Sequence, residues 1–341
     1  MKIYIADRLI DKQESPYIIA EAGSNHNGDF EQAKKLIDIA VESGSDAVKF
    51  QIFKADMIYS KYTPEFSTMK GQNVYNLIQK LETPREWIPR LAQYCKKKKI
   101  HFLATPFDFE AVDVLKDYVP AFKIASFEMG DLELLAYAAD AGKPMIISTG
   151  MARLGEIEEA IQAVRSVGND EIILLHCNSL YPTPVDLVNL NAIKTMKTAF
   201  NLPIGFSDHT LGVHIPIAAA ALGACVIEKH VTLDKTFEGP DHSFALEPHE
   251  LKYMVSSIRD LVKAFGNGIK EKSSAEQEAF QKGRRSIHAK VDIPKNTEIT
   301  SEMLIVKRPG YGIEPKFINI VTGRRAQCLI KSDQWILWDM V

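Results

Sequence analysis

The sequence has little of several features that define large classes of protein. Its four cysteines lie far apart and lack the paired spacing of a metal site, which indicates reduced thiols in a cytosol. We expect Cys95, Cys177, Cys225 and Cys328 to be buried as small hydrophobic residues. The formal net charge is only −3 over 341 residues. The chain as a whole is therefore not drawn to nucleic acid or to an acidic membrane surface.

Long apolar stretches are also missing from the sequence. The first residues, MKIYIADRLIDKQ, are interrupted by charges and contain no apolar core, so we expect no secretory signal. The longest apolar run, residues 215–227, is too short to span a bilayer and is broken by Gly223. We therefore expect a cytoplasmic protein with no membrane or nucleic-acid partner. A hydrophobic content of 46% and a charged content of 25% are typical of an ordinary globular protein and exclude disorder.

Eight short apolar runs between residues 17 and 230 each stop at a cluster of polar residues. Amphipathic stretches such as FEQAKKLIDIAVESG separate these runs, and this alternation predicts a (β/α)8 barrel. In such a barrel the carboxyl ends of all strands meet at one end and form a single pocket. The polar residues that end the runs are, in chain order, Glu21, Lys49 with Gln51, Thr105, Lys123 with Ser126, Ser148 with Thr149, Asn178 with Ser179, Ser207 with Asp208 and His209, and Lys229 with His230.

The chain is longer than a usual barrel, and its composition changes along its length. We predict four parts: an N-terminal hairpin capping the bottom of the barrel (1–16), a catalytic TIM barrel (17–265), a linker (266–282) and a small mixed α+β domain (283–341). Residues 284–341 carry a formal charge of +4 and residues 1–283 a charge of −7. A basic lobe suits delivery of cations to an anionic substrate, although simple variation of the surface explains it equally well. The long segment of residues 52–81 is expected to be a lid or specificity element.

Two histidines end neighbouring predicted strands. Because adjacent strands lie about 5 Å apart, His209 and His230 can share one divalent metal ion. Two imidazoles leave coordination positions open, as a Lewis-acid site requires. Asp208 and Glu228 flank the histidines and are candidates to orient them. The alternative is that each histidine is only a hydrogen-bonding residue.

Two lysines, Lys49 and Lys123, lie at otherwise apolar strand ends. A buried ammonium is costly without an anion, so the pair suggests a phosphate or carboxylate ligand. An ion pair across the barrel mouth is the alternative for each lysine, and one of them could be a Schiff-base nucleophile as in barrel aldolases. The hydroxyl groups expected to bind the same anion belong to Thr105, Ser126, Ser148 and Ser207.

Polar residues also occupy the predicted loops at the same end. Asn25, His26 and Asn27 either cap the first helix or bind a ligand. Asp241 and Tyr181 lie after the eighth and sixth strands, where each could bind sugar hydroxyls; a turn aspartate is the alternative for the former.

Taken together, nine motifs resemble the signature of the sialic acid synthase family over nearly the whole chain. They are AEAGSNHNG, KFQ, TPFD, KIASFE, STGM, YPTP, GFSDHT, EKH and GPDH. The C-terminal RRSIHAKVDIPKNTEIT and KRPGYGI resemble the antifreeze-like (SAF) domain of that family. The resemblance implies a transferase that condenses phosphoenolpyruvate with an N-acylated mannosamine-type sugar and releases phosphate.

The resemblance also implies roles for individual residues. His209 and His230 would hold Mn²⁺ (or Mg²⁺), while Glu21 and Glu128 would orient the reacting hydroxyls or water. Arg308 would reach from the SAF domain over the barrel of a second chain to the N-acyl group, which implies a domain-swapped homodimer. The phosphoenolpyruvate ligands would be Lys49, Thr105, Lys123, Ser126, Ser148, Ser207 and one of Asn178 and Ser179, and the sugar ligands Gln51, Tyr181 and Asp241.

The acceptor sugar is left open by the motifs. An N-acetylneuraminate-type synthase using N-acetylmannosamine is the primary expectation, and a legionaminate or pseudaminate synthase using a 2,4-diacetamido-2,4,6-trideoxy hexose is the alternative. The loop of residues 62–81, with Gln72 and Asn73, faces the sugar in the predicted barrel, but its contact is unassigned. Two other classes remain for comparison: a Schiff-base aldolase using Lys123, and a non-enzymatic carbohydrate-binding scaffold, which does not explain the convergent lysines and histidines.

Overall fold

The computed structural model describes residues 2–11, 14–64 and 73–341. The chain divides into two compact units, Met1–Gly266 and Asn267–Val341, and each is described by itself. The first unit contains the eight predicted strands, and the second contains the short strands near the carboxyl terminus.

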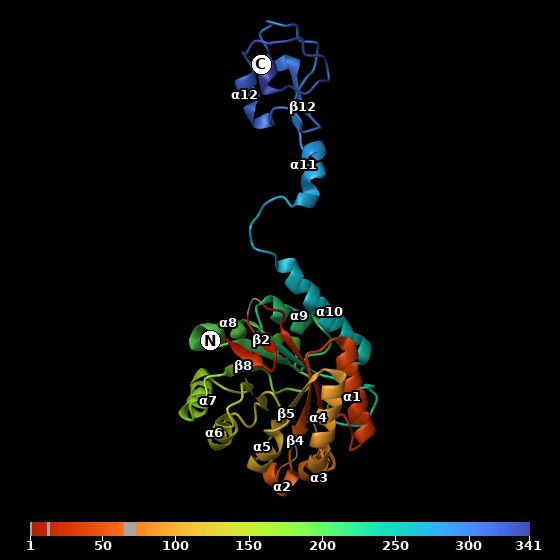
Figure 1. Ribbon diagram of the computed structural model, residues 1–341, viewed down its shortest axis with the longest axis vertical. Coiled ribbons are helices and arrows are strands. Elements are labelled where there is room, and N and C mark those ends of the chain that lie inside the picture. The colour runs from red at the N-terminus through yellow and green to blue at the C-terminus, as the bar shows by residue number, and fades with distance from the viewer. Residues whose placement is uncertain (1, 12–13, 65–72) are drawn as a thin grey trace. The chain divides into compact units, whose positions relative to one another are not determined.

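The first unit is a closed barrel of eight parallel strands, with β10 pairing with β3 to complete the circle (Figure 1). The predicted (β/α)8 fold is therefore confirmed. Nearly every strand residue is buried on both faces, as expected for parallel strands covered by helices. The strands are β3 (Tyr17–Gly23), β4 (Ala47–Ile52), β5 (His101–Pro106), β6 (Phe122–Ile124), β7 (Met145–Ser148), β8 (Ile172–Cys177), β9 (Ile204–Asp208) and β10 (Val226–His230).

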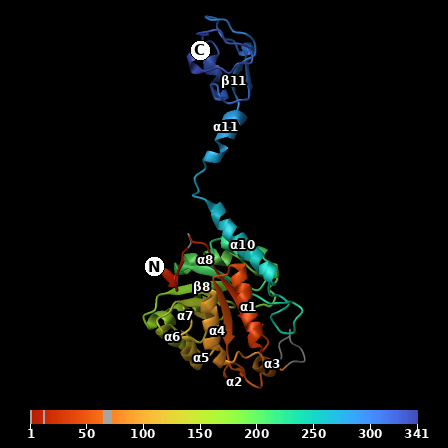
Figure 2. The same cartoon turned by 45° about the vertical axis from the view of Figure 1, so that its right-hand side comes forward.

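Helices cover the outside of the barrel (Figures 1 and 2). Their apolar side chains pack in one core with those of the strands. In α1 the spacing of Ala33, Leu36, Ile37 and Ala40 places four apolar side chains on one face. The side chain of Asp29 caps this helix, so capping, one of the two alternatives for residues 25–27, is wrong. The helices are α1 (Phe30–Ser43), α4 (Ile88–Lys98), α5 (Phe109–Leu115), α6 (Leu132–Asp140), α7 (Leu154–Ser166), α8 (Asn191–Phe200), α9 (His214–Ala221) and α10 (Pro248–Phe265).

An antiparallel hairpin closes the amino-terminal end of the barrel. Its strands are β1 (Ile3–Ile5) and β2 (Arg8–Ile10). Ile3, Ile5 and Ile10 are buried in one cluster with residues of the barrel interior such as Leu103. Because this end is filled with apolar side chains, polar side chains inside the barrel collect at the opposite end.

The long segment after β4 contains two short helices, α2 (Ala55–Ile58) and α3 (Val74–Lys80). Asn73 caps α3 by accepting a hydrogen bond from the backbone of Asn76. Gln72 and the rest of residues 65–72 lie outside the described residues, so the predicted sugar contact of this loop stays a prediction.

The second unit has a small core of its own. It begins with a capping box formed by Ser273 and Glu276, followed by α11 (Gln277–Gly283). The strands β11 (Ser286–Ala289) and β12 (Leu304–Lys307) pair antiparallel, and α12 (Ile318–Val321) follows. The core residues are Ile287, Ala289, Ile293, Ile299, Leu304, Ile313, Val321, Ala326, Ile330, Ile336 and Val341.

Two expectations from composition can be compared with the structure. Cys95, Cys177 and Cys225 are buried as predicted, but Cys328 is exposed, so that prediction is wrong for one of the four. Across residues 2–11, 14–64 and 73–341, none of the helices has the length and apolar character needed to cross a membrane.

Candidate active site

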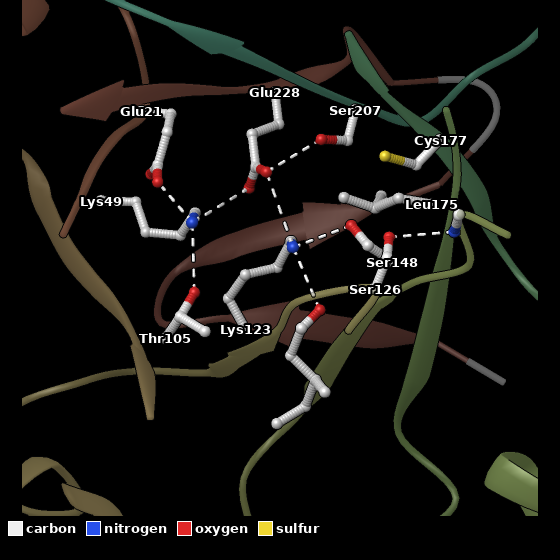
Figure 3. A network of polar contacts seen from close by, with 12 residues as sticks. Glu21, Lys49, Thr105, Lys123, Ser126, Ser148, Leu175, Cys177, Ser207 and Glu228 are labelled. Carbon is white, nitrogen blue, oxygen red and sulfur yellow. Dashed lines mark hydrogen bonds and ion pairs between the residues drawn. The ribbon is translucent and has the colours of Figure 1, made fainter. Parts of the chain in front are cut away.

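Two buried lysines and two buried glutamates form a polar network at the carboxyl ends of the barrel strands (Figure 3). Lys49 extends from β4, Lys123 from β6, Glu21 from β3 and Glu228 from β10. All four are at most 4% exposed, so their charges are compensated by one another instead of by water. The structure thus brings together the two lysines that the sequence singled out.

Lys49 is held by three side chains. Its Nζ lies 2.8 Å from Glu21 Oε2 and donates to Thr105 Oγ1 at 3.1 Å. Glu228 Oε2 is 3.8 Å away, which is an ion pair without a short hydrogen bond. Burial disfavours the ammonium, but the two carboxylates outweigh it and hold the pKa of Lys49 above its usual range. Lys49 is therefore a permanent cation in the pocket.

Lys123 is less well compensated. Its Nζ donates to Ser148 Oγ at 2.8 Å and to the carbonyl of Ile124 at 3.1 Å, and it lies 3.5 Å from Glu228 Oε1. Burial lowers the pKa of Lys123, and Glu228 only partly opposes this effect. An anion placed beside Lys123 would supply the compensation that the protein provides incompletely.

Glu228 was not predicted to lie between the lysines. Because residues alternate along a strand, Glu228 and His230 point into the barrel and Lys229 points outward. Lys229 pairs with Asp208 at 2.5 Å, and both are fully buried. The prediction that Asp208 and Glu228 orient the histidines is therefore wrong: the first binds Lys229 and the second binds the two active-site lysines.

The hydroxyl groups around the lysines differ in the direction of their hydrogen bonds. Thr105 and Ser148 accept from the two lysines, and Ser126 Oγ accepts from the Gly150 backbone N–H at 2.9 Å. These three hydroxyls can each still donate their proton to an anion. Ser207 differs because its hydroxyl donates to Glu228 Oε1 at 3.0 Å, which leaves it only lone pairs for a ligand.

The structure distinguishes the two residues that follow β8. The side-chain amide of Asn178 donates to the carbonyl of Leu187 at 3.0 Å. Ser179 Oγ is buried and has no hydrogen-bond partner within the described part of the chain. A Cβ at Gly150 would clash with this oxygen, so only glycine at that position leaves room for the Ser179 hydroxyl. Ser179 is the better candidate to bind a ligand.

His209 and His230 lie side by side, with ring centroids 5.4 Å apart. His209 Nδ1 is 2.7 Å from the carbonyl of Asn178, and since a carbonyl only accepts, Nδ1 carries the proton and Nε2 keeps its lone pair. Burial lowers the pKa of His209 to about 4 and that of His230 well below its usual range. Both rings are therefore neutral at physiological pH, the form that ligates a metal ion.

A divalent metal ion fits these two rings. His230 Nδ1 is buried and makes no hydrogen bond to any described residue; Asp241 Oδ2 lies 3.5 Å from it. A metal ion would satisfy this orphaned nitrogen. Within residues 2–11, 14–64 and 73–341 no group of three or more His, Cys, Asp and Glu side chains is arranged to hold a metal, so further ligands would have to come from substrate or water.

The predicted sugar ligands gather around Gly23. A Cβ at this position would lie 3.4 Å from Glu21 Oε1 and 3.5 Å from both Asp241 Oδ2 and Gln51 Nε2. Gln51 Nε2 donates to Glu21 Oε1 at 2.8 Å. Burial first, and then the charge of Glu21, raises the pKa of Asp241 to about 7. Burial also raises the pKa of Glu21.

Three other side chains complete this end of the barrel. The Tyr181 ring lies 4.2 Å from the His209 ring, between centroids. Glu128 follows β6; burial raises its pKa to about 7, and its Oε2 has no hydrogen-bond partner among the described residues. Cys177 lies close to Ser207 (Figure 3). Its Sγ is 3.9 Å from His209 Nδ1, and burial raises its thiol pKa to about 11. No pattern in the sequence distinguishes Cys177 from an ordinary core cysteine.

Arg308 belongs to the second unit. Its Nε donates to the carbonyl of Gly283 at 2.6 Å. Together with Arg285, Val306 and Lys307 it lines a cavity of about 280 Å³. Its predicted contact with the barrel of a second chain stays a prediction.

Fold and site define the class of protein: a (β/α)8-barrel protein with two buried lysines and a pair of neutral imidazoles at the carboxyl ends of its strands. Comparison with known proteins identifies the family. The NeuB family pattern matches residues 36–270, and the SAF domain pattern matches residues 284–341. The chain belongs to the NeuB family, and the predicted class, a transferase-type condensing enzyme of the sialic acid synthase family, is confirmed.

Individual relatives are similar over nearly their whole length. The N,N'-diacetyllegionaminic acid synthase of Campylobacter jejuni is 46% identical, over 94% of this chain and 98% of its own. The human N-acetylneuraminate-9-phosphate synthase is 35% identical, over 98% and 95%. The crystal structure of the N-acetylneuraminic acid synthetase of Leptospira borgpetersenii, in complex with citrate, superposes with a TM-score of 0.74 and 36% identity, over 82% of this chain and 94% of that one.

Proposed function

We propose that this enzyme condenses phosphoenolpyruvate with an N-acylated mannosamine-type sugar to form a nonulosonic acid, with release of phosphate. The observation that carries the proposal is the meeting of two kinds of group in one pocket. Lys49 and Lys123 offer buried positive charge for an anion, and His209 and His230 offer neutral imidazoles for a metal beside a carbonyl. Both requirements belong to a reaction between an anionic donor and an aldehyde.

Phosphoenolpyruvate would bind against the lysines through its carboxylate and phosphate. Thr105, Ser126 and Ser148 would donate hydroxyl protons to these groups, because their oxygens already accept other bonds. Ser179 would add a further donor, in preference to Asn178. Ser207 would contribute to this site only after its hydroxyl leaves Glu228.

Mn²⁺ is the proposed metal, with Mg²⁺ as the alternative, held by His209 Nε2 and by His230. When bound, the ion would supply Lewis-acid polarisation of the acceptor aldehyde. The protein fixes the two rings for this purpose: the Asn178 carbonyl sets the tautomer of His209, and burial keeps both rings neutral.

The reaction forms a bond between C3 of phosphoenolpyruvate and the aldehyde carbon. Water adds at C2, the bond from C2 to the phosphate oxygen breaks, and inorganic phosphate leaves. Glu128 is suited to hold a proton near neutral pH, because burial raises its pKa to about 7. Glu21, fixed by Lys49 and Gln51, is suited to orient a hydroxyl or water. We assign the two glutamates these roles.

The acceptor sugar would bind to Gln51, Tyr181 and Asp241, and Arg308 from a second copy would contact its N-acyl group. This arrangement requires a domain-swapped homodimer. A cytoplasmic location follows from the use of phosphoenolpyruvate as the donor. Two acceptors remain candidates, N-acetylmannosamine and the 2,4-diacetamido-2,4,6-trideoxy hexose. The 46% identity to an N,N'-diacetyllegionaminic acid synthase favours the second.

Release of phosphate from phosphoenolpyruvate, measured with Mn²⁺ and each acceptor in turn, tests the function. We expect turnover with at least one acceptor and a loss of more than a hundredfold in His209→Ala and His230→Ala. His249→Ala, which removes an exposed imidazole, is the matched control and should keep full activity. Full turnover by the two active-site variants in metal-free buffer would overturn the proposal.

A further inference from the structure

A hydrogen bond joins two loops at the mouth of the barrel that are distant in sequence. Asn27 lies in the loop after β3, and His242 lies in the loop after β10. His242 Nε2 donates to Asn27 Oδ1 at 3.1 Å. The site described above uses neither residue, although both belong to motifs that the sequence analysis singled out.

The His242 ring is fixed on all sides. Its Nδ1 forms a hydrogen bond of 2.6 Å with the Thr232 hydroxyl, and the Phe237 ring packs edge-on with centroids 5.7 Å apart. A Cβ at Gly239 would lie 2.7 Å from His242 Cδ2, so only glycine allows this close approach. The imidazole is completely buried. A ring held this tightly has one orientation.

A second bond ties the same two loops. Asn25 Nδ2 donates to the carbonyl of Val231 at 2.9 Å, and this bond is buried. The two bonds, Asn25 to Val231 and Asn27 to His242, are together called the clasp. They hold both ends of the segment 231–242, whose residues 236–239 are exposed. Capping does not explain these asparagines, because Asp29 caps α1.

Asp241 lies next to the clasp in sequence and places its side chain in the pocket. It precedes His242 directly, and its Oδ2 lies 3.5 Å from His230 Nδ1. Its carboxylate also approaches Gln51 and Glu21 around Gly23. The segment before Asp241 is exposed, whereas His242 directly after it is fixed. We therefore expect His242 to determine where the Asp241 carboxylate lies.

We propose that Asn27 and His242 are positioning residues that hold Asp241 in place for the acceptor sugar. This inference rests on the proposed function, in which Asp241 binds the acceptor. The bonds of Lys49 and Lys123 do not include Asn27 or His242, so we expect the clasp to affect binding of the acceptor more than binding of phosphoenolpyruvate.

Substitutions at Asn27 test the link directly. The residue has a φ of +51°, a conformation that glycine adopts freely and that aspartate tolerates. Asn27→Gly therefore removes the acceptor oxygen without strain, and Asn27→Asp keeps it. We expect the first variant to raise the KM for the acceptor sugar about tenfold, because the buried imidazole of His242 loses the partner of its Nε2. In Asn27→Asp the KM for the acceptor sugar should stay within about twofold of the wild-type value.

Substitutions at His242 separate its two bonds. The amide nitrogen of His242→Gln reaches the position of Nε2 and can still donate to Asn27, whereas His242→Asn can only replace Nδ1. We expect the glutamine variant to retain the acceptor KM better than the asparagine variant. In Asn27→Gly, amide hydrogen exchange of residues 232–242 should accelerate, while the dissociation constant for phosphoenolpyruvate stays within about twofold of wild type.

Asn169→Ala is the matched control. Asn169 is buried, and its side-chain amide donates to two backbone carbonyls, of Ala139 and Lys143, at the opposite end of the barrel. The substitution should lower stability at least as much as Asn27→Gly and leave the acceptor KM unchanged. If wild-type enzyme turns over an acceptor and Asn27→Gly leaves its KM and the exchange of residues 232–242 unchanged, the inference is wrong. If wild-type enzyme uses no acceptor, the proposed function fails, and faster exchange in Asn27→Gly alone still establishes the clasp.

Discussion

Replacing Glu128 by glutamine should stabilise the barrel above neutral pH. Burial raises the pKa of this carboxyl from about 4.5 to about 7. The folded protein thus keeps the proton to higher pH than the unfolded chain, and stability falls as the pH rises from 4.5 to 7. A shift of this size corresponds to about 3 kcal/mol, which partial solvent exposure of the residue reduces to about 2 kcal/mol. Glutamine has the same shape and cannot ionise.

Thermal unfolding of wild type and Glu128→Gln at pH 5 and pH 8 measures this effect. At pH 8 we expect a melting temperature of the barrel about 4 °C higher in the variant, and at pH 5 nearly equal values. Glu159→Gln changes the charge equally at an exposed helix position and should shift neither value. A variant that is less stable than wild type at pH 8, or a gain of equal size at both pH values, would refute the reasoning.

Three further outcomes follow from the site. Lys123→Met should raise the KM for phosphoenolpyruvate at least a hundredfold in steady-state assays. The reason is that Glu228 would lose one of its two ammonium partners and repel the incoming anion. An unchanged KM would contradict the assignment of Lys123 as a phosphoenolpyruvate ligand. Borohydride added with pyruvate should leave the mass of the chain unchanged, whereas a reduced adduct on Lys123 would indicate a Schiff-base aldolase. Arg308→Ala should raise the KM for the acceptor about tenfold and leave that for phosphoenolpyruvate unchanged; sedimentation should show the same dimer, and a monomer or a shared loss would argue against the proposed contact.

Strand ends could be predicted from the sequence because apolar runs and their polar ends are local features. Lys49 and Lys123 were located correctly because a lysine within an apolar strand is costly to bury and is seldom found there without a nearby anion. The same reasoning identified His209 and His230 at neighbouring strand ends, and the structure places their rings side by side. The barrel fold and the polar residues at the carboxyl ends of its strands could therefore be predicted from the sequence.

The sequence did not allow us to predict which side chains pair with one another. Asp208 and Glu228 each precede a histidine or lie near one, yet the first bonds Lys229 and the second bonds the active-site lysines. Which face of the barrel a residue occupies depends on the register of each strand, and one position of shift reverses it. The link between Asn27 and His242 spans 215 positions of sequence, so no local pattern could reveal it.

The balance of charge in the pocket determines how an anion can enter it. Two lysines face two glutamates, so these four groups carry no net formal charge, and a ligand must compete with a carboxylate for each ammonium. Glu21 holds Lys49 at 2.8 Å, whereas Glu228 lies 3.8 Å from Lys49 and 3.5 Å from Lys123, beyond good hydrogen-bond distance. In the proposed reaction Glu228 is therefore the partner that phosphoenolpyruvate would displace, and its departure would also free the Ser207 hydroxyl to donate. Glu228 would favour the charged form of both lysines before the substrate arrives, and the substrate would gain a donor as it takes over that position.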